Sequence, residues 1–153
     1  MPNDVIEKLK ELNLELPEIS TPGGNYQSVN IRGKIVYVAI QFPIYNGNFL
    51  YKGRLGLEIN SQDGYNALQL CALNVLAQIN SKVGFEKIVG LNHIDVYYRA
   101  VQNWHDSPKI ADGASNLFAN VLGAKGQHSR GLMGVENFPG NFSVGLITTW
   151  TLI

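Results

Sequence analysis

The sequence predicts an α+β domain in which two helices cover one face of a mixed β-sheet. Two segments repeat their apolar residues at the spacing of an amphipathic helix. Before, between and after them lie runs rich in β-branched and aromatic residues, separated by glycine-containing turns. The resulting order is β-β-β-α-β-α-β-β. Because both helices should pack on the same side, the other face of the sheet is left open.

An amphipathic helix is expected ahead of this domain. Asn3 or Asp4 can cap it, and it should end before Pro17. Its apolar residues recur at helical spacing, at Val5, Ile6, Leu9 and Leu12. We therefore divide the chain into an N-terminal helical extension, residues 1–20, and a domain that spans residues 21–153.

The first half of the domain has the pattern of a three-stranded meander. After a loop rich in Pro and Gly, strands are expected over residues 26–31, 34–40 and 48–57. Gly33 and the pair Asn46-Gly47 fall between these runs and are typical of the tight turns in β-hairpins.

Two helices and three more strands follow. Ser61 can cap the first helix, which should end at Gly84. Ser107 can cap the second, where Pro108 suits the first turn and Gly123 marks the end. The remaining β-rich runs cover residues 87–99, 129–135 and 142–152.

Composition is typical of one globular domain and excludes several classes of partner. Of the 153 residues, 45% are hydrophobic and 16% are charged. So little charge leaves an apolar surface, which oligomerisation would explain. Lys plus Arg number 12 and Asp plus Glu number 12, without a basic cluster, so we expect no nucleic-acid partner. Apolar runs fall far short of the ~20 residues that cross a bilayer. The first ten residues are amphipathic rather than signal-like. We therefore expect a cytoplasmic protein without membrane contact.

No metal or cofactor site is indicated. Cys71 is the single cysteine, which excludes an internal disulfide and a cysteine-rich metal site, and we interpret it as a core residue. The three histidines, His93, His105 and His128, lack the close spacing of metal ligands. No glycine motif of a nucleotide-binding loop is present. His93 and Asp95 share one face of a predicted strand without a nucleophile motif, so we expect a polar face there rather than a catalytic triad.

Arg130 is the residue that most needs a functional explanation. It stands at the start of an apolar, glycine-flanked β-run, next to Ser129 and close to His128. A guanidinium there is costly unless an anion meets it, and its planar fork suits a carboxylate. The alternative is a structural salt bridge to Asp or Glu, and the residues alone leave both explanations open.

Several motifs occur in a characteristic order. They are Gly24-Asn25-Tyr26 after the first loop, Gln41-Phe42-Pro43 after the second strand, and Arg130 at the start of the fifth. In this order they resemble the RidA family, also called YjgF, the reactive-intermediate deaminases. The resemblance runs from about Pro22 to the C-terminus. Residues 70–76 and 112–115 are also similar to a longer, less characterised branch that carries an N-terminal helical extension.

The resemblance implies a fold, an assembly and an activity. The fold is the chorismate-mutase-like α+β fold, and the assembly is a homotrimer with small-molecule pockets at its three subunit interfaces. Active members hydrolyse enamine or imine intermediates, such as 2-aminoacrylate, to 2-oxo acids and ammonia without a cofactor. In them an Arg holds the substrate carboxylate, a Tyr lines the pocket, and a Glu on the last strand positions water.

The binding residues of the family carry over better than the catalytic one. The carboxylate-binding Arg matches Arg130 and the pocket Tyr matches Tyr26. Asp112 stands where the family has a helix-start Asn, and it would place a negative charge near the carboxylate unless Arg130, His128 or protonation offsets it. The candidate ligand-binding residues are therefore Arg130, Tyr26, Asp112 and His128.

The water-positioning Glu does not carry over. Its position is Gly145, which has no side chain to hold a water. Two further departures are Ile40, where the family has a Gly whose amide meets substrate, and Leu132, where it has a Cys. Ile40 would fill space in the pocket.

Three hypotheses about function follow. The first is a RidA-like homotrimer that binds a small carboxylate or related metabolite, with deaminase activity weak or lost. The second is an active enamine or imine deaminase in which His128, Asp112 or Glu136 positions water instead. The third is an interaction or chaperone-like protein, since relatives have also been described as endoribonucleases or translation inhibitors. The balanced charge weighs against RNA.

Overall fold

The computed structural model describes residues 2–153, with side chains from Asp4 onward. A five-stranded mixed sheet forms its centre, with strand order β1-β2-β7-β5-β6. The parallel pair is β5 with β6, and the other neighbours are antiparallel. The strands are β1 (Val29–Arg32), β2 (Ile35–Gln41), β5 (Ile88–Tyr98), β6 (Ser129–Gly134) and β7 (Val144–Leu152). The predicted mixed sheet is confirmed.

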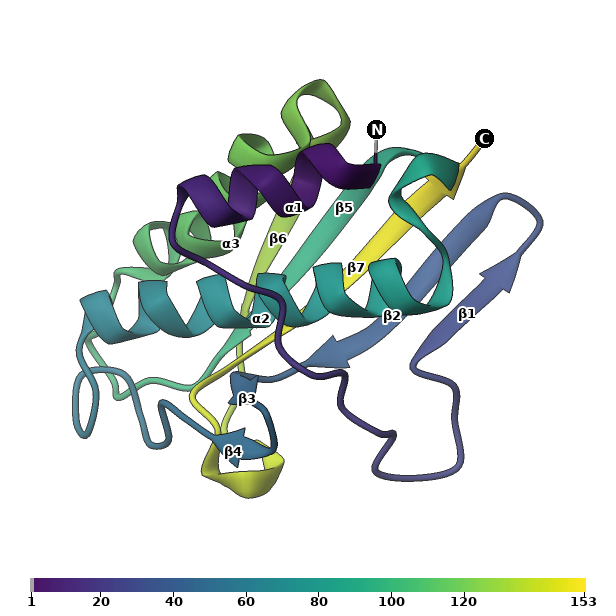
Figure 1. The fold of residues 1–153 in the computed structure, drawn as a ribbon. Coiled ribbons are helices and arrows are strands. Elements are labelled where there is room, and N and C mark those ends of the chain that lie inside the picture. The colour runs from purple at the N-terminus through teal and green to yellow at the C-terminus, as the bar shows by residue number, and fades with distance from the viewer. Residues whose placement is uncertain (1) are drawn as a thin grey trace.

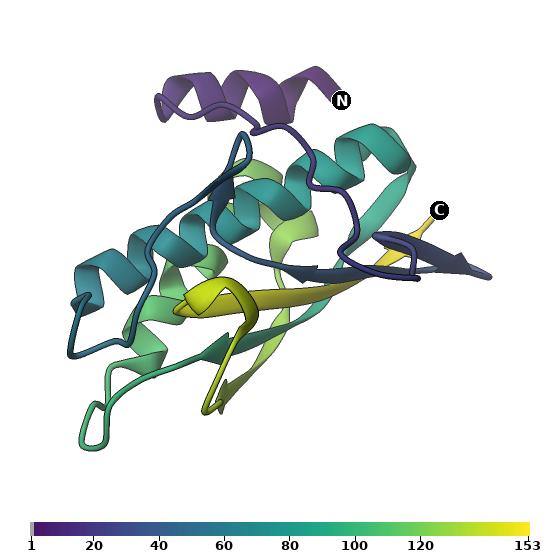
Figure 2. The same cartoon turned by 90° about the horizontal axis from the view of Figure 1, so that it is seen from below.

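Two helices, α2 (Ser61–Lys82) and α3 (Ser107–Leu122), lie on the same face of this sheet, as Figures 1 and 2 show. The α+β prediction with both helices on one side is therefore confirmed. Their buried sides meet the inner residues of the strands, and Trp150 and Phe118 are among the largest fully buried side chains. Cys71 lies inside this core.

The helix starts differ in detail from the prediction. Asn60, not Ser61, caps α2: its Oδ1 accepts a hydrogen bond from the Asp63 amide at 2.8 Å, and the Asp63 carboxylate accepts one from the Asn60 amide at 3.1 Å. The α3 helix begins at Ser107, so this residue is its first and not its cap. Ser61 instead joins the two starts, since its Oγ lies 2.5 Å from Asp106 Oδ2.

A third helix, α1 (Pro2–Glu11), packs against α3 and η1 (Phe85–Lys87). It begins ahead of Asn3 and Asp4, which we expected to cap it; the side chain of Asn3 lies outside the described residues. Val5 and Leu9 are buried in the same core as the sheet and helices. The division into an extension and a domain stays a prediction.

The predicted third strand, residues 48–57, is wrong. Instead β3 (Ile44–Tyr45) and β4 (Asn48–Phe49) form a two-stranded hairpin of their own across the Asn46-Gly47 turn. The chain then leaves the extended region, because Tyr51, Gly53 and Gly56 have φ values of 54°, 111° and 85°. Leu55, fully buried, anchors this loop to the core.

Two other strands begin later than predicted. The first starts at Val29 and not at residue 26, because the loop bends at residues 23–26, where the Tyr26 amide donates to the Gly24 carbonyl at 3.0 Å. The last starts at Val144, after the short helical turn η3 (Pro139–Asn141). A further turn, η2 (Gly123–Gly126), follows α3. No helix of the described chain is long and apolar enough to cross a membrane.

The face of the sheet opposite the helices, called the open face below, carries no helix in Figure 2. Cross-strand pairing aligns Tyr37, Thr149, His93 and Ser129 in one row on it. Tyr37 is 48% exposed, and His93 and Thr149 are partly exposed. The prediction of an uncovered sheet face therefore holds for the single chain.

Candidate functional site

Arg130 lies on the edge strand β6 and reaches toward helix α3. Its Nη1 donates to Asp112 Oδ1 at 2.7 Å and to Ser115 Oγ at 3.2 Å, and its Nη2 donates to the Pro108 carbonyl at 3.4 Å. The ion pair with Asp112 is the structural alternative that the sequence left open. It does not bury either group, because the side chains of Arg130 and Asp112 stay 27% and 50% exposed.

His128 holds this group in place through Ser115. Its Nδ1 lies 2.6 Å from the Gly126 carbonyl, which can only accept, so Nδ1 carries the proton. In the neutral ring Nε2 is then an acceptor, and it receives the hydroxyl of Ser115 at 2.9 Å. The Ser115 oxygen remains free to accept from Arg130. Both ring nitrogens are thus engaged, and we name Arg130, Asp112, Ser115 and His128 the Arg130 cluster.

Tyr26 lies away from the Arg130 cluster. It precedes β1, and the strand order places β1 and β6 at opposite edges of the sheet (Figure 1). Its ring is 49% exposed and its hydroxyl accepts the Gly23 amide at 3.2 Å. One chain therefore brings together three of the four predicted binding residues, Arg130, Asp112 and His128, but not Tyr26.

A pocket of about 640 Å³ opens beside Tyr26, and we call it the Tyr26 pocket. Its walls come from the loop before β1, from the end of β2, from the β3–β4 hairpin and from residues 138–142. None of its lining residues is charged. Four phenylalanines line it: Phe42, Phe49, Phe138 and Phe142. The sequence analysis missed this pocket, because its phenylalanines are scattered over three segments and no periodic pattern links them.

Gly145 lies buried on β7, next to Ile40 and Phe42, which line this pocket. A Cβ atom at Gly145 would lie 2.7 Å from Ile40 Cδ1 and 3.1 Å from Phe42 Cε1. The side chains of Ile40, on β2, and of Phe42, directly after β2, thus occupy the space into which a residue at position 145 would extend. The expectation that Ile40 fills space here agrees with this geometry.

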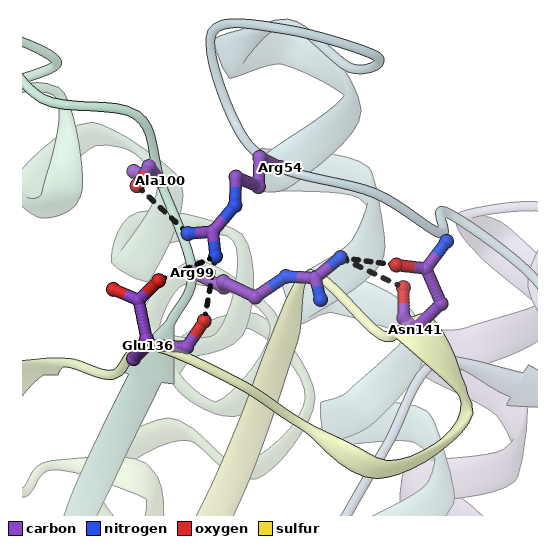
Figure 3. Close-up of polar contacts among 5 residues, drawn as sticks. All are labelled: Arg54, Arg99, Ala100, Glu136 and Asn141. Atoms are coloured by element: carbon purple, nitrogen blue, oxygen red, sulfur yellow. Dashed lines mark hydrogen bonds and ion pairs between the residues drawn. The ribbon is translucent and has the colours of Figure 1, made fainter.

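Two further arginines, Arg54 and Arg99, bind the segment that follows β6, as Figure 3 shows. Arg54 donates to the Glu136 carboxylate at 2.9 Å, to the Glu136 carbonyl at 2.9 Å and to the Ala100 carbonyl at 3.3 Å. Arg99 is only 7% exposed and donates to the side chain and carbonyl of Asn141. Both arginines hold the segment that supplies residues 138–142 to the Tyr26 pocket. Glu136, one of the candidate water-positioning groups, is bound to Arg54 and 85% exposed.

The open face carries a hydrogen-bonded chain of three polar side chains. His93 Nε2 lies 2.9 Å from Asp95 Oδ1, and His93 Nδ1 lies 2.7 Å from Ser129 Oγ. Ser129 joins them because β5 and β6 pair in parallel with His93 opposite Ser129. Sequence reasoning found His93 and Asp95 on one face but could not supply this pairing. The side chains of His93 and Asp95 are 40% and 34% exposed, so the chain lies at the surface of a single copy.

The described side chains do not supply a set of metal ligands. Within residues 2–153, no group of three or more His, Cys, Asp or Glu side chains is placed to hold a metal ion. Cys71 is fully buried, and burial raises the pKa of its thiol well above the ordinary value. A buried, protonated thiol is neither a ready ligand nor a nucleophile.

Residues 7–150 match the family described as "YjgF/chorismate_mutase-like, putative endoribonuclease". The chain belongs to the YjgF family. The resemblance and the chorismate-mutase-like fold that the sequence predicted are thereby confirmed.

Three proteins of similar length match most of this chain. A protein named TCP17 from Trypanosoma cruzi is 28% identical over 137 residues, which cover 88% of this chain and 86% of that protein. A crystal structure from Shewanella oneidensis, titled a "putative endoribonuclease", has a TM-score of 0.93 at 30% identity and covers 97% of this chain and 99% of its own. The Agrobacterium tumefaciens protein Atu1372, of unknown function, has a TM-score of 0.93 at 29% identity, covering 99% and 94%.

A more distant YjgF-like structure shares the fold alone. Escherichia coli TdcF with bound serine has a TM-score of 0.60 at 15% identity and covers 89% of this chain and 92% of its own. The Shewanella and Agrobacterium structures are more similar to this chain, each with a TM-score of 0.93.

Proposed function

We propose that this YjgF-family protein binds a carboxylate-bearing metabolite in pockets between the copies of a homotrimer, with enamine or imine deaminase activity weak or lost. Arg130 binds the carboxylate. The observation that carries the proposal is the position of Arg130, a partly exposed guanidinium held by Asp112 and Ser115 at one edge of the sheet.

The Arg130 cluster is better suited to binding an anion than to stabilising the fold through an ion pair. Surface ion pairs contribute only about 0–1 kcal/mol, so the bond to Asp112 is a weak reason to keep an arginine here. His128 orients the Ser115 hydroxyl, whose oxygen accepts a hydrogen bond from Arg130. The guanidinium is thereby fixed, and not all of its N–H donors are used. A ligand carboxylate can displace or share the bond to Asp112 at small cost.

The positions of Arg130 and Tyr26 support assembly. A site that needs both residues requires two copies, since Arg130 and Tyr26 lie toward opposite edges of one sheet. Repeated head-to-tail contact closes into a ring when the rotation between copies allows it, and a trimer is the smallest such ring beyond a dimer. The open face and the low charge content are consistent with contact between copies.

Loss of deaminase activity is favoured by what surrounds Gly145. No side chain can project there while Ile40 keeps its place. The three groups that could position water instead are already engaged: Asp112 with Arg130, His128 with Gly126 and Ser115, and Glu136 with Arg54. A binding function therefore fits this chain better than the family's hydrolysis.

The test combines binding, turnover and assembly. Pyruvate binding is measured by calorimetry for the wild type, for Arg130→Ala and for Lys10→Ala, an exposed cation of α1 that serves as control. We expect Arg130→Ala to weaken binding at least about tenfold, the loss of one charge-assisted pair, and Lys10→Ala to leave it unchanged. Pyruvate formation from 2-aminoacrylate should stay close to the spontaneous rate, and light scattering should give the mass of three chains.

Two outcomes would contradict the proposal. Equal affinity in the wild type and Arg130→Ala would remove the role of Arg130. An acceleration of 2-aminoacrylate hydrolysis that Arg130→Ala abolishes would show that the protein is an active deaminase after all.

A further inference from the structure

The Tyr26 pocket has the chemistry of a site for an aromatic group. Phe42 and Phe142 stack with centroids 4.6 Å apart and an interplanar angle of 5°, and Phe49 lies 4.7 Å from Phe142. Phe138 meets Phe42 edge to face at 5.6 Å. These rings form a prepared apolar wall, and aromatic rings pack on one another in these same two geometries.

The pocket is also left open at a cost. Phe49 is 48% exposed and Tyr26 is 49% exposed, although large apolar side chains gain free energy when they leave water. A volume of about 640 Å³ falls within the ~300–1,000 Å³ that ligand pockets occupy. An apolar group that entered would cover both rings.

The polar groups that line this pocket carry no charge: they are the hydroxyls of Ser20, Thr21, Ser28 and Tyr26 and the side-chain amide of Gln41. Gln41 donates its amide to the Ala39 carbonyl at 3.0 Å, and the Tyr26 hydroxyl accepts the Gly23 amide. Gly145 offers no side chain, and Ile40 presents methyl groups where it lies. Neutral donors of this kind compensate the desolvation of a compact anion less well than a cation does, so such an anion gains little by entering the pocket without a cation.

We propose that the ligand is a carboxylate with an aromatic side chain, whose ring enters the Tyr26 pocket while its carboxylate meets Arg130 of a neighbouring copy. The inference rests on the proposed function for the carboxylate half, and it adds the class of side chain. It selects against compact 2-oxo acids and enamines, because these leave the phenylalanine wall in water.

The experiment compares two ligands that differ by one ring. Pyruvate and phenylpyruvate are titrated by calorimetry into the full-length protein, its Arg130→Ala variant, its Phe49→Ala variant and Leu57→Ala. Leu57, 69% exposed and outside the pocket, is the matched control for loss of an exposed apolar side chain. We expect phenylpyruvate to bind roughly ten- to a hundredfold more tightly than pyruvate, the gain from moving one phenyl ring out of water.

The variants separate the two halves of the proposal. Phe49→Ala should reduce the ratio of the two affinities at least about threefold, and Leu57→Ala should not change it. Phe49→Leu, which keeps an apolar wall, should give an intermediate ratio of the two affinities. It also provides the test if Phe49→Ala fails to fold. Arg130→Ala should weaken both ligands by a similar factor.

Different results would contradict the aromatic preference of the Tyr26 pocket and the role of Arg130. Equal affinities for both ligands, with both lost in Arg130→Ala, would overturn the aromatic preference and leave the proposed function standing. That result is also expected if a side chain of a neighbouring copy fills the pocket. If Arg130→Ala leaves the affinity for both ligands unchanged, the proposed function is overturned, whatever the ratio of the two affinities.

Discussion

The Ile40 side chain occupies the space that a side chain at position 145 would need. The Cβ that any other residue would place at position 145 falls 2.7 Å from Ile40 Cδ1, closer than two carbon atoms can approach. The resemblance to the YjgF family predicts that both positions depart from its pattern, one by losing a carboxylate and the other by gaining a branched side chain. The two side-chain volumes are complementary, so a side chain at position 145 requires Ile40 to shift.

Gly145→Ala should therefore destabilise the protein by about 1–2 kcal/mol through overpacking against Ile40. In Ile40→Ala/Gly145→Ala the added methyl finds room, so a double-mutant cycle should show a coupling of at least about 0.5 kcal/mol. Urea unfolding measures both. Gly23→Ala is the control, since nothing lies within 4 Å of a Cβ there. Additive effects of the two substitutions would show that the residues do not compete for space.

Asp112→Asn should strengthen carboxylate binding. It keeps the shape of the side chain but removes the charge that partly neutralises Arg130. An exposed ion pair of this kind contributes about 0.2–1 kcal/mol, so pyruvate affinity should rise up to about fivefold. The gain should shrink at high salt, because screening weakens the interaction with exposed charges. Glu11→Gln, an exposed carboxylate on α1, should have no effect. Weaker binding in Asp112→Asn would mean that Asp112 positions Arg130 more than it competes for it.

Local patterns in the sequence predicted the helices and the long strands well. Strand β5 and helices α2 and α3 have bounds within two residues of those expected, because their periodic apolar residues meet one core. The two-residue strands of the hairpin at residues 44–49 are too short for any period, and the loop after them depends on positive φ at Tyr51. The late start of β1 depends on a bend that no pattern marks.

The candidate site was only partly within reach of the sequence. Arg130 was conspicuous as a charge in an apolar strand, and its contact with Asp112 was among the stated alternatives. The relay through Ser115 was not predicted, since it depends on how η2 turns the chain between α3 and β6. The wall of phenylalanines and the bond from Ser129 to His93 likewise come from pairing between distant segments. Such contacts have no local signature.

Arg99 should tolerate replacement by methionine better than by alanine. Its guanidinium is buried without a carboxylate, its Nε has no partner among the described residues, and its acceptor Asn141 is exposed and can bind water instead. Arg99→Met keeps the volume and should stay within about 1 kcal/mol of the wild type, whereas Arg99→Ala should lose about 2–3 kcal/mol through the cavity it leaves. Thermal unfolding compares the two. Equal losses would mean that the charge itself stabilises the fold.

The Cys71 thiol should make stability fall at alkaline pH. Burial raises its pKa in the folded protein, so the folded chain keeps a proton that the unfolded chain loses above about pH 8.5. Its contribution is fully present below that pH and declines above it, by at most about 1.4 kcal/mol per pH unit. Urea unfolding at pH 7.5 and 9.5 should show a larger drop for the wild type than for Cys71→Ala. An identical drop in both proteins would contradict the prediction.

The placement of Arg130 and Tyr26 at opposite edges of one sheet has a consequence for mixtures of defective chains. If each pocket takes its arginine from one copy and its tyrosine from the next, Arg130→Ala and Tyr26→Ala chains each bind ligand weakly alone but complement one another. Random co-assembly of equal amounts would rebuild about a quarter of the pockets, those with an intact residue on both sides. Co-expression of the two variants should therefore give a fraction of sites with wild-type affinity, which neither homogeneous protein has.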